Sequence, residues 1–175
     1  MGRALIVAML ALAVVVGAGM YYLQVYAYYE DVTAEVGDIT LPVAMDGGDP
    51  LVVPFTNFRG IDSISSPLRY RACFDTDISM ITLAATAQAL PFAEPRVAPR
   101  WFDCFDALQL GADLQNGDAA AYLSIANLEY GIDRVIAFYP DGRGYIWHEI
   151  NPCGEAVFNR NPAPDNCPEP PESLQ

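Results

Sequence analysis

The sequence predicts an α+β domain carried on an N-terminal transmembrane helix. Residues 4–23 form an apolar run without a charged side chain, which is typical of a membrane-spanning helix. Strand-like and helix-like segments then alternate, and the clearest pair, residues 133–139 and 144–150, flanks a turn-rich tetrapeptide typical of a hairpin. Four cysteines follow the apolar run. We therefore predict a small, mostly antiparallel sheet with about two helices packed on one face and two disulfides.

The apolar run fixes where the chain resides. A helix of that length spans about 30 Å, the thickness of a bilayer's hydrocarbon core. Arg3 is the only charged side chain before it, which predicts a cytoplasmic N-terminus and an exported remainder. Five tyrosines lie within residues 21–29, as expected at a membrane interface. A signal peptide cleaved near Gly17–Gly19 is the alternative interpretation, and it exports the same residues.

The exported part divides into three segments, and its elements are bounded by turn and capping residues. Residues 1–23 are the anchor, 24–38 a juxtamembrane linker, 39–155 a periplasmic α+β domain and 156–175 a proline-rich tail, which we expect to be disordered after Cys167. The predicted elements are strands at 39–45 and 51–55 around a turn at 46–50, a loop at 59–67, a strand at 68–74, a helix from the Asp75–Asp77 cap to about Leu90, a helix at 101–115 stopped by Gly117, and strands at 119–126, 133–139 and 144–150.

The cysteines predict crosslinks rather than a metal site. An even number of cysteines in an oxidising compartment favours disulfides, and three pairings are open. We favour Cys73–Cys104 with Cys153–Cys167, because the second pair brackets a compact proline-rich tail. The sequence has neither a Cys-x-x-Cys motif nor a second histidine, so we expect no zinc and no other metal or cofactor.

The charge excludes several classes of function. The chain has 22 acidic residues against 9 arginines and no lysine, for a formal net charge of −13. Such acidity argues against nucleic-acid binding, which needs a basic face. Without a lysine, the chain cannot form a P-loop, a kinase strand lysine or a Schiff base.

The sequence shows no combination of a nucleophile, a base and an acid that is typical of a catalytic site. His148 is the only histidine, and its place beside Trp147 in an apolar strand predicts a half-exposed strand residue. Asp133, Asp141 and Glu149 are near it in the sequence, but no G-x-S-x-G motif accompanies them. We therefore expect no catalytic residues.

Some residues are better candidates for contacts than for chemistry. Alternation over residues 68–74 places Arg69 and Arg71 opposite the apolar face of their strand, where they could pair with acids or meet an anionic partner. Trp101 lies among aromatic residues that surround Cys104 and could bury against a disulfide. The candidate contact residues are Arg69, Arg71, Trp101 and His148.

Four stretches carry a resemblance to a known family: MYYLQVYAYYE, SPLRYRACF, WFDCFDALQLGADLQNGDA and YGIDRVIAFYPDGRGYIWHEINPCGE. They resemble a family of uncharacterised bacterial membrane-anchored proteins, some of which carry the label "histidine kinase". The resemblance spans residues 20–155 and implies no established activity. This chain does not support the label, because its one histidine lies in a strand and it has no glycine-rich nucleotide loop.

These observations predict a non-enzymatic accessory protein of the bacterial inner membrane. The cytoplasmic N-terminus, single membrane pass and periplasmic domain would place it beside a larger membrane complex or a periplasmic protein partner. One alternative is a periplasmic module that binds or senses a small ligand, which requires an apolar pocket with convergent polar groups. The other is an envelope hydrolase that uses His148 or a carboxylate pair.

Overall fold

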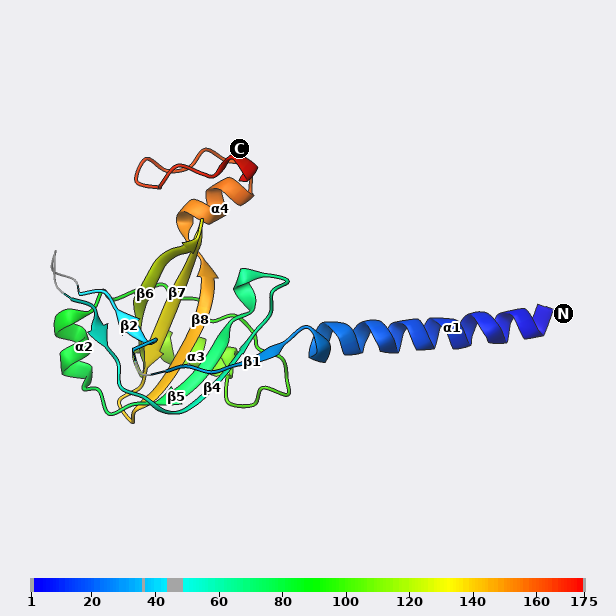
Figure 1. Ribbon diagram of the computed structural model, residues 1–175, viewed down its shortest axis with the longest axis horizontal. Coiled ribbons are helices and arrows are strands. Elements are labelled where there is room, and N and C mark those ends of the chain that lie inside the picture. Colours follow the sequence, from blue (N-terminus) through cyan, green and yellow to red (C-terminus); the bar gives the residue numbers. More distant parts are fainter. Residues whose placement is uncertain (1, 36, 44–48, 175) are drawn as a thin grey trace.

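A six-stranded antiparallel sheet organises the domain, in a computed structural model that describes residues 2–35, 37–43 and 49–174 (Figure 1). The strand order is β1-β4-β5-β8-β7-β6, and every neighbouring pair is antiparallel. The strands are β1 (Glu30–Val32), β4 (Thr56–Asp62), β5 (Arg71–Asp75), β6 (Ala120–Glu129), β7 (Ile132–Phe138) and β8 (Arg143–Ile150).

The N-terminal helix α1 (Gly2–Tyr22) projects away from the sheet and continues as a short π-helical segment, Leu23–Ala27 (Figure 1). All of the large apolar side chains along it are exposed. Within the described chain, Gly2–Ala27 is the one helix long and apolar enough to cross a membrane. The predicted apolar helix is therefore confirmed.

The sheet is covered on both faces, so the domain has two cores. On one face, Ile136 and Phe138 pack with the small sheet formed by β2 (Thr40–Leu41) and β3 (Leu51–Val52) and with helix α2 (Met80–Thr86). On the other, Val135 and Ala137 pack with helix α3 (Ala107–Asn116) and the aromatic residues before it. The two helices thus lie on opposite faces rather than on one, because successive residues of β7 and β8 are apolar on both sides.

The β7–β8 hairpin forms as predicted. Phe138 pairs with Gly144, and the turn between them includes Gly142 at a φ of 93°, a left-handed conformation that favours glycine. The predicted alternation of β5 is also confirmed, because Ala72 and Phe74 enter one core and Cys73 the other. Gly117 caps α3 with a φ of 81°, as its position predicts.

Five predictions need correction, and part of another lies outside the described residues. The predicted loop at 59–67 begins with strand β4, whose alternation is masked by a register shift between Thr56 and Arg59. Helix α2 begins after Ser79, whose side chain caps it, and is shorter than predicted. Helix α3 likewise begins after Asp106. A fourth helix, α4 (Pro152–Phe158), occupies residues expected to be irregular, and strand β1 lies within the segment interpreted as a linker. The turn at 46–50 and the end of its preceding strand fall largely on residues 44–48, which are not described.

Both disulfides form with the favoured pairing. Cys73–Cys104 ties β5 to the segment that precedes α3, and Cys153–Cys167 ties α4 to the tail. Such crosslinks indicate an oxidising compartment. The tail after Cys167 is described as far as residue 174 and ends in a 3-10 turn, Glu172–Leu174.

Candidate functional site

Two buried charged side chains, Arg71 and Glu149, bond to an irregular segment that we call the strap. We define the strap as residues 91–101, which lie between α2 and α3. Arg71, in β5, donates from Nε to the Arg96 carbonyl (2.7 Å) and from Nη2 to the Val97 carbonyl (3.3 Å). Its Nη1 donates to the carbonyls of Leu68 and Tyr70. Burial lowers the pKa of Arg71 to about 10, so the guanidinium stays charged at neutral pH and holds the strap through carbonyl oxygens.

Glu149, in β8, also holds the strap. Its Oε2 accepts hydrogen bonds from the Trp147 indole N–H and from the backbone N–H of Glu94, both at 2.9 Å. Burial raises the pKa of Glu149, and the carboxylate of Asp133, directly opposite it on β7, raises it further. The two carboxylates therefore form a cross-strand pair whose negative charge is costly to bury.

These carboxylates line a cavity of about 580 Å³ between the strap, the ends of β7 and β8, and α4. The described lining contributes four carboxylates and one guanidinium, that of Arg96, together with apolar side chains. A cavity of this size and mixed lining can take a small ligand or a side chain of a partner. Its charge favours a cationic group joined to an apolar one. The lining residues are Leu90, Pro91, Phe92, Glu94, Arg96, Asp133, Glu149, Ile150, Asn151, Pro152, Glu155, Phe158 and Asn159.

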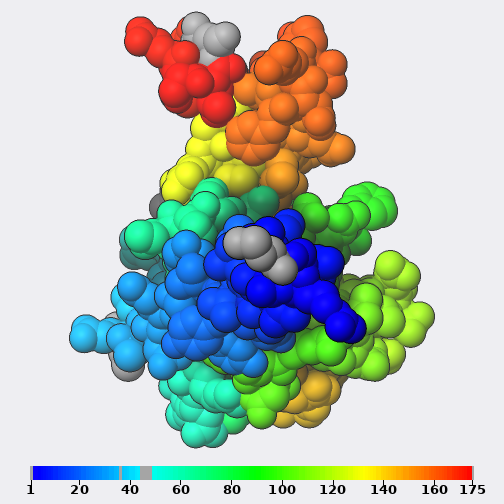
Figure 2. Space-filling view, turned by 90° about the vertical axis from the view of Figure 1, so that its right-hand side faces the viewer, coloured from blue at the N-terminus to red at the C-terminus, as the bar shows by residue number. Residues whose placement is uncertain are grey.

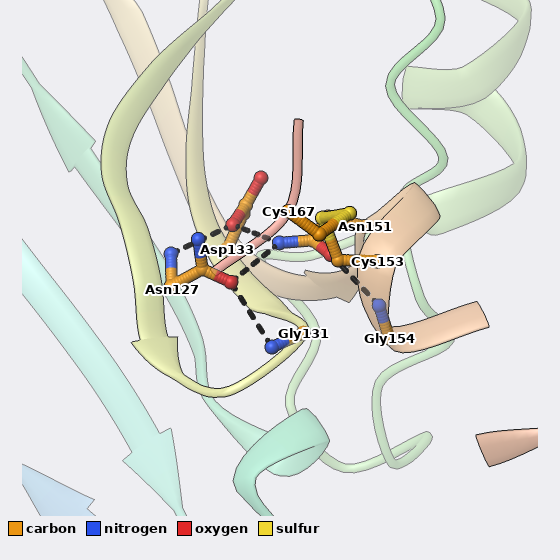
Figure 3. The surroundings of a disulfide bond; sticks show 7 residues. All are labelled: Asn127, Gly131, Asp133, Asn151, Cys153, Gly154 and Cys167. Carbon is orange, nitrogen blue, oxygen red and sulfur yellow. Dashed lines mark hydrogen bonds between the residues drawn. A yellow bond between two sulfur atoms is a disulfide. The ribbon is translucent and has the colours of Figure 1, made fainter. Parts of the chain in front are cut away.

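A hydrogen-bond network orders the wall of the cavity beside the Cys153–Cys167 disulfide (Figure 3). The Asn151 amide donates to Asp133 Oδ1 (2.7 Å) and to Asn127 Oδ1 (3.0 Å). Asn151 Oδ1 in turn accepts the backbone N–H of Gly154 and so caps α4. One asparagine thus fixes both the Asp133 carboxylate and the helix that borders the cavity.

Two glycines, Gly131 and Gly154, allow the β6–β7 turn and α4 to approach each other closely in this wall. Gly131, in the β6–β7 turn, has a φ of 76°, and a Cβ atom placed on it would lie 2.3 Å from the Cα of Gly154. No real side chain tolerates that approach. The turn and α4 are therefore in backbone contact, which a sequence pattern alone does not reveal.

His148 lies outside the cavity, on the opposite face of the sheet from Glu149. It is buried rather than half-exposed, and its ring stacks on Tyr70 with centroids 4.8 Å apart. Nδ1 lies 2.6 Å from the Pro67 carbonyl, and Nε2 accepts the Nε–H of Arg134 at 3.0 Å. Burial lowers the pKa of His148 to about 4. Both ring nitrogens are thus engaged by the protein, in a neutral ring with its proton on Nδ1.

Arg69 and Trp101 meet at the junction between α1 and the domain rather than at the cavity. The Trp101 indole N–H donates to the Val25 carbonyl (2.6 Å), and its ring stacks on Tyr26. Tyr29 packs edge-on against Trp101, and the Arg69 guanidinium lies 5.5 Å from the Tyr29 ring. Of the four candidate contact residues, the structure brings Arg69 and Trp101 together, and it places Arg71 beneath the strap and His148 in the core.

Sequence reasoning did not identify the acidic cavity. Its one available signal is Glu149, which shares the inward-facing side of β8 with Trp147 and is therefore an acid at a buried position. Glu94 and Asn151 carry no such signal, because irregular chain brings them to the site.

Comparison with known protein families finds a match over residues 40–168 to a family of unknown function, DUF6446. Neither the curated proteins nor the solved structures contain a match to this chain.

Proposed function

The chain belongs to DUF6446, a family without an assigned function, and from its structure we propose that it is a non-enzymatic interaction protein anchored in the bacterial inner membrane. In this proposal α1 spans the membrane once, with its N-terminus in the cytoplasm. The disulfide-linked domain lies in the periplasm. There it contacts a larger membrane complex or a periplasmic protein through the acidic cavity.

One observation carries the proposal: the cavity gathers four carboxylates around a partly apolar space, beneath a strap that buried charges hold in place. The matching occupant is an amine or guanidinium attached to an apolar group. An arginine or lysine side chain next to an aromatic or aliphatic residue of a protein partner has this chemistry. Binding would relieve the repulsion between Glu149 and Asp133.

The indole N–H of Trp147 offers a direct reporter of occupancy. It donates to Glu149 Oε2, whereas the other tryptophan of the chain, Trp101, donates to the Val25 carbonyl and lies outside the lining of the cavity. We would titrate the ¹⁵N-labelled full chain in nanodiscs with phenethylamine, an amine on an apolar stem. The Trp147 signal should shift in a saturable manner, while the Trp101 signal stays in place.

Two matched comparisons make this test specific. Phenethyl alcohol has a similar shape without the charge and should shift the Trp147 signal far less. The variant Glu155→Gln removes one exposed carboxylate from the cavity and should weaken binding of the amine. Equal shifts of both tryptophan signals, or none, would contradict the proposal.

A periplasmic module that binds or senses a free small ligand is the second candidate, and the volume of the cavity, about 580 Å³, favours it. Crosslinking separates the two candidates. A photoreactive residue at the exposed Phe92 should capture a protein in native membranes if the partner is a protein, whereas one at the exposed Leu108, which is outside the lining, should not. An adduct from neither position, with amine binding intact, would favour the free ligand. A hydrolase remains the weakest candidate, because both ring nitrogens of His148 are bonded within the fold.

A further inference from the structure

We propose that the domain makes a second contact with the bilayer, beside α1, through the tip of the turn at residues 62–66 and through the strap. Ile64 and Val97 would enter the membrane interface, and Arg100 would lie at the level of the headgroups. This inference rests on the proposed membrane anchor and is independent of what binds in the cavity.

Helix α1 is fixed to the domain by contacts of Trp101. The hydrogen bond from Trp101 to the Val25 carbonyl and the stack of Trp101 on Tyr26 join the strap to the π-helical end of the helix. Tyr29 completes the contact on the other side of the Trp101 ring. The face of the domain that surrounds α1 is therefore held in a defined direction relative to the helix axis.

Residues of the strap lie at the depth of the membrane interface. Tyr21 and Tyr26 belong to the belt expected at the membrane interface, and they line a hollow together with Val97, Arg100 and Trp101 of the strap. Because these strap residues border the same hollow as the belt, they lie at the level of the interface when α1 spans the bilayer. Tryptophan and tyrosine are the residues that such interfaces favour.

Two segments of the domain project on the same side as α1. In Figure 1 the turn between β4 and the 3-10 helix Pro67–Arg69 projects to the same side as α1. Figure 2 looks along α1 and shows two flanking segments, the blue-green chain around residues 63–68 and the green chain around residues 90–105. Contact of Arg69 with the Tyr29 ring confirms that the first segment reaches the junction.

These two segments expose aliphatic side chains, those of Ile64 and Val97. Ile64 is fully exposed at the tip of a turn, where the Ser63 and Ser65 hydroxyls bond to each other across it. Val97 is exposed on the strap. Val97 borders the hollow beside α1, and lipid is the occupant that fits exposed aliphatic side chains on the same side of the domain as a membrane-spanning helix.

The face that surrounds α1 carries arginine side chains. The chain is strongly acidic, yet two of its nine arginines, Arg69 and Arg100, lie in or beside this face. Arg100 is exposed and forms no ion pair with any residue that the structure describes. Cationic side chains beside aromatic and aliphatic ones match the anionic headgroups and the apolar edge of a bilayer.

Spin labels can measure the predicted contact in the full chain. The described residues include no free cysteine, so one introduced cysteine is a unique labelling site. We would label Ile64→Cys and Val97→Cys separately in phosphatidylcholine–phosphatidylglycerol vesicles. Their accessibility to oxygen, which concentrates in lipid, would be compared with that to a water-soluble nickel chelate. The control is Ile81→Cys, an isoleucine on α2 that is also exposed and lies at the far end of the domain from α1.

The expected result is an oxygen-to-nickel ratio several-fold higher at positions 64 and 97 than at position 81. Equal ratios at all three positions would overturn the proposal and leave this face free for a protein partner. A label on α1, Val15→Cys, separates failure of this inference from failure of the anchor. If position 15 also reports water, α1 does not span the bilayer and the proposed function fails first.

Discussion

At the scale of single residues, the domain uses charged side chains as internal supports rather than as surface pairs. Arg71 and Glu149 each hold the strap through backbone groups, and neither forms an ion pair among the described residues. A buried charge is tolerated when hydrogen bonds satisfy it. Arg71 is predicted from the sequence as a contact residue, because alternation shows which face a residue occupies, not whether irregular chain covers that face.

His148 predicts a specific dependence of stability on pH. Its pKa is about 4 in the folded chain, below the ordinary value of about 6.5 in the unfolded chain. Between these pH values the unfolded state holds the extra proton, so the free energy of unfolding falls as the pH falls. At about 1.4 kcal/mol per pKa unit, the loss approaches about 3 kcal/mol.

The test compares wild-type chain with His148→Gln by denaturant unfolding at several pH values with the disulfides intact. The variant should lose much of the decline between pH 6.5 and 4. Glu149 acts in the opposite sense, because its raised pKa contributes stability that is lost as the pH rises. It is present in both chains and cancels in their difference. Parallel pH profiles for the two chains would show that His148 does not carry the effect.

At the scale of elements, the regular hydrophobic pattern of the sequence predicted the strands of the hairpin. It did not predict strand β4 or helix α4, whose sequences are irregular. The strands β6, β7 and β8 have long apolar runs between turn residues, and the predicted bounds differ from the observed ones by a few residues. Strand β4 contains Asn57 at a φ of 52° and a register shift, which break its alternation. Helix α4 is only seven residues long and contains a glycine, Gly154, which is unfavourable inside helices.

The cavity could not be predicted for the same reason. Its walls come from the strap, from a strand pair and from α4, and only the strand pair has a sequence pattern. The opposition of Asp133 and Glu149 follows from the register of the hairpin, which pairs them once the Pro140–Arg143 turn is placed. A closer reading of that register could have found the acidic pair, but not the strap that covers it.

Gly131→Ala tests whether α4 depends on backbone contact with the β6–β7 turn. The new Cβ would collide with Gly154, and the residue has a left-handed conformation. We expect a loss of about 3 kcal/mol of unfolding free energy, of which about 1 reflects the conformation alone. Gly117→Ala is the matched control, since it has a similar φ of 81° and nothing within 4 Å of its Cβ.

Chemical denaturation of the two variants checks this difference. Equal destabilisation by both substitutions would mean that the wall relaxes around the extra methyl group. A greater loss for Gly131→Ala, together with faster amide exchange in α4, would support the contact.

At the scale of the whole molecule, the strap connects three features: the cavity, the junction with α1 and, through the residues that follow it, the Cys73–Cys104 disulfide. Trp101 is the point at which the domain and the helix meet. Its substitution should therefore change their relative orientation more than the stability of the core.

Trp101→Phe keeps an aromatic ring but removes the hydrogen bond to the Val25 carbonyl, which is worth about 1 kcal/mol. Trp101→Ala removes the stack on Tyr26 as well. We expect the distance distribution between spin labels at positions 15 and 81 to broaden in Trp101→Phe and more so in Trp101→Ala. Pulsed electron paramagnetic resonance in nanodiscs measures it. Unchanged widths in both variants would show that other contacts fix the junction.

The sequential pairing of the disulfides has a consequence for biosynthesis. The first cysteine bonds to the second and the third to the fourth. A domain that enters an oxidising space in the order of its sequence presents its thiols in this same order, so Cys104 and Cys167 each find their native partner already exported. Maturation then needs an oxidase to withdraw electrons but no isomerase to reshuffle mispaired sulfurs.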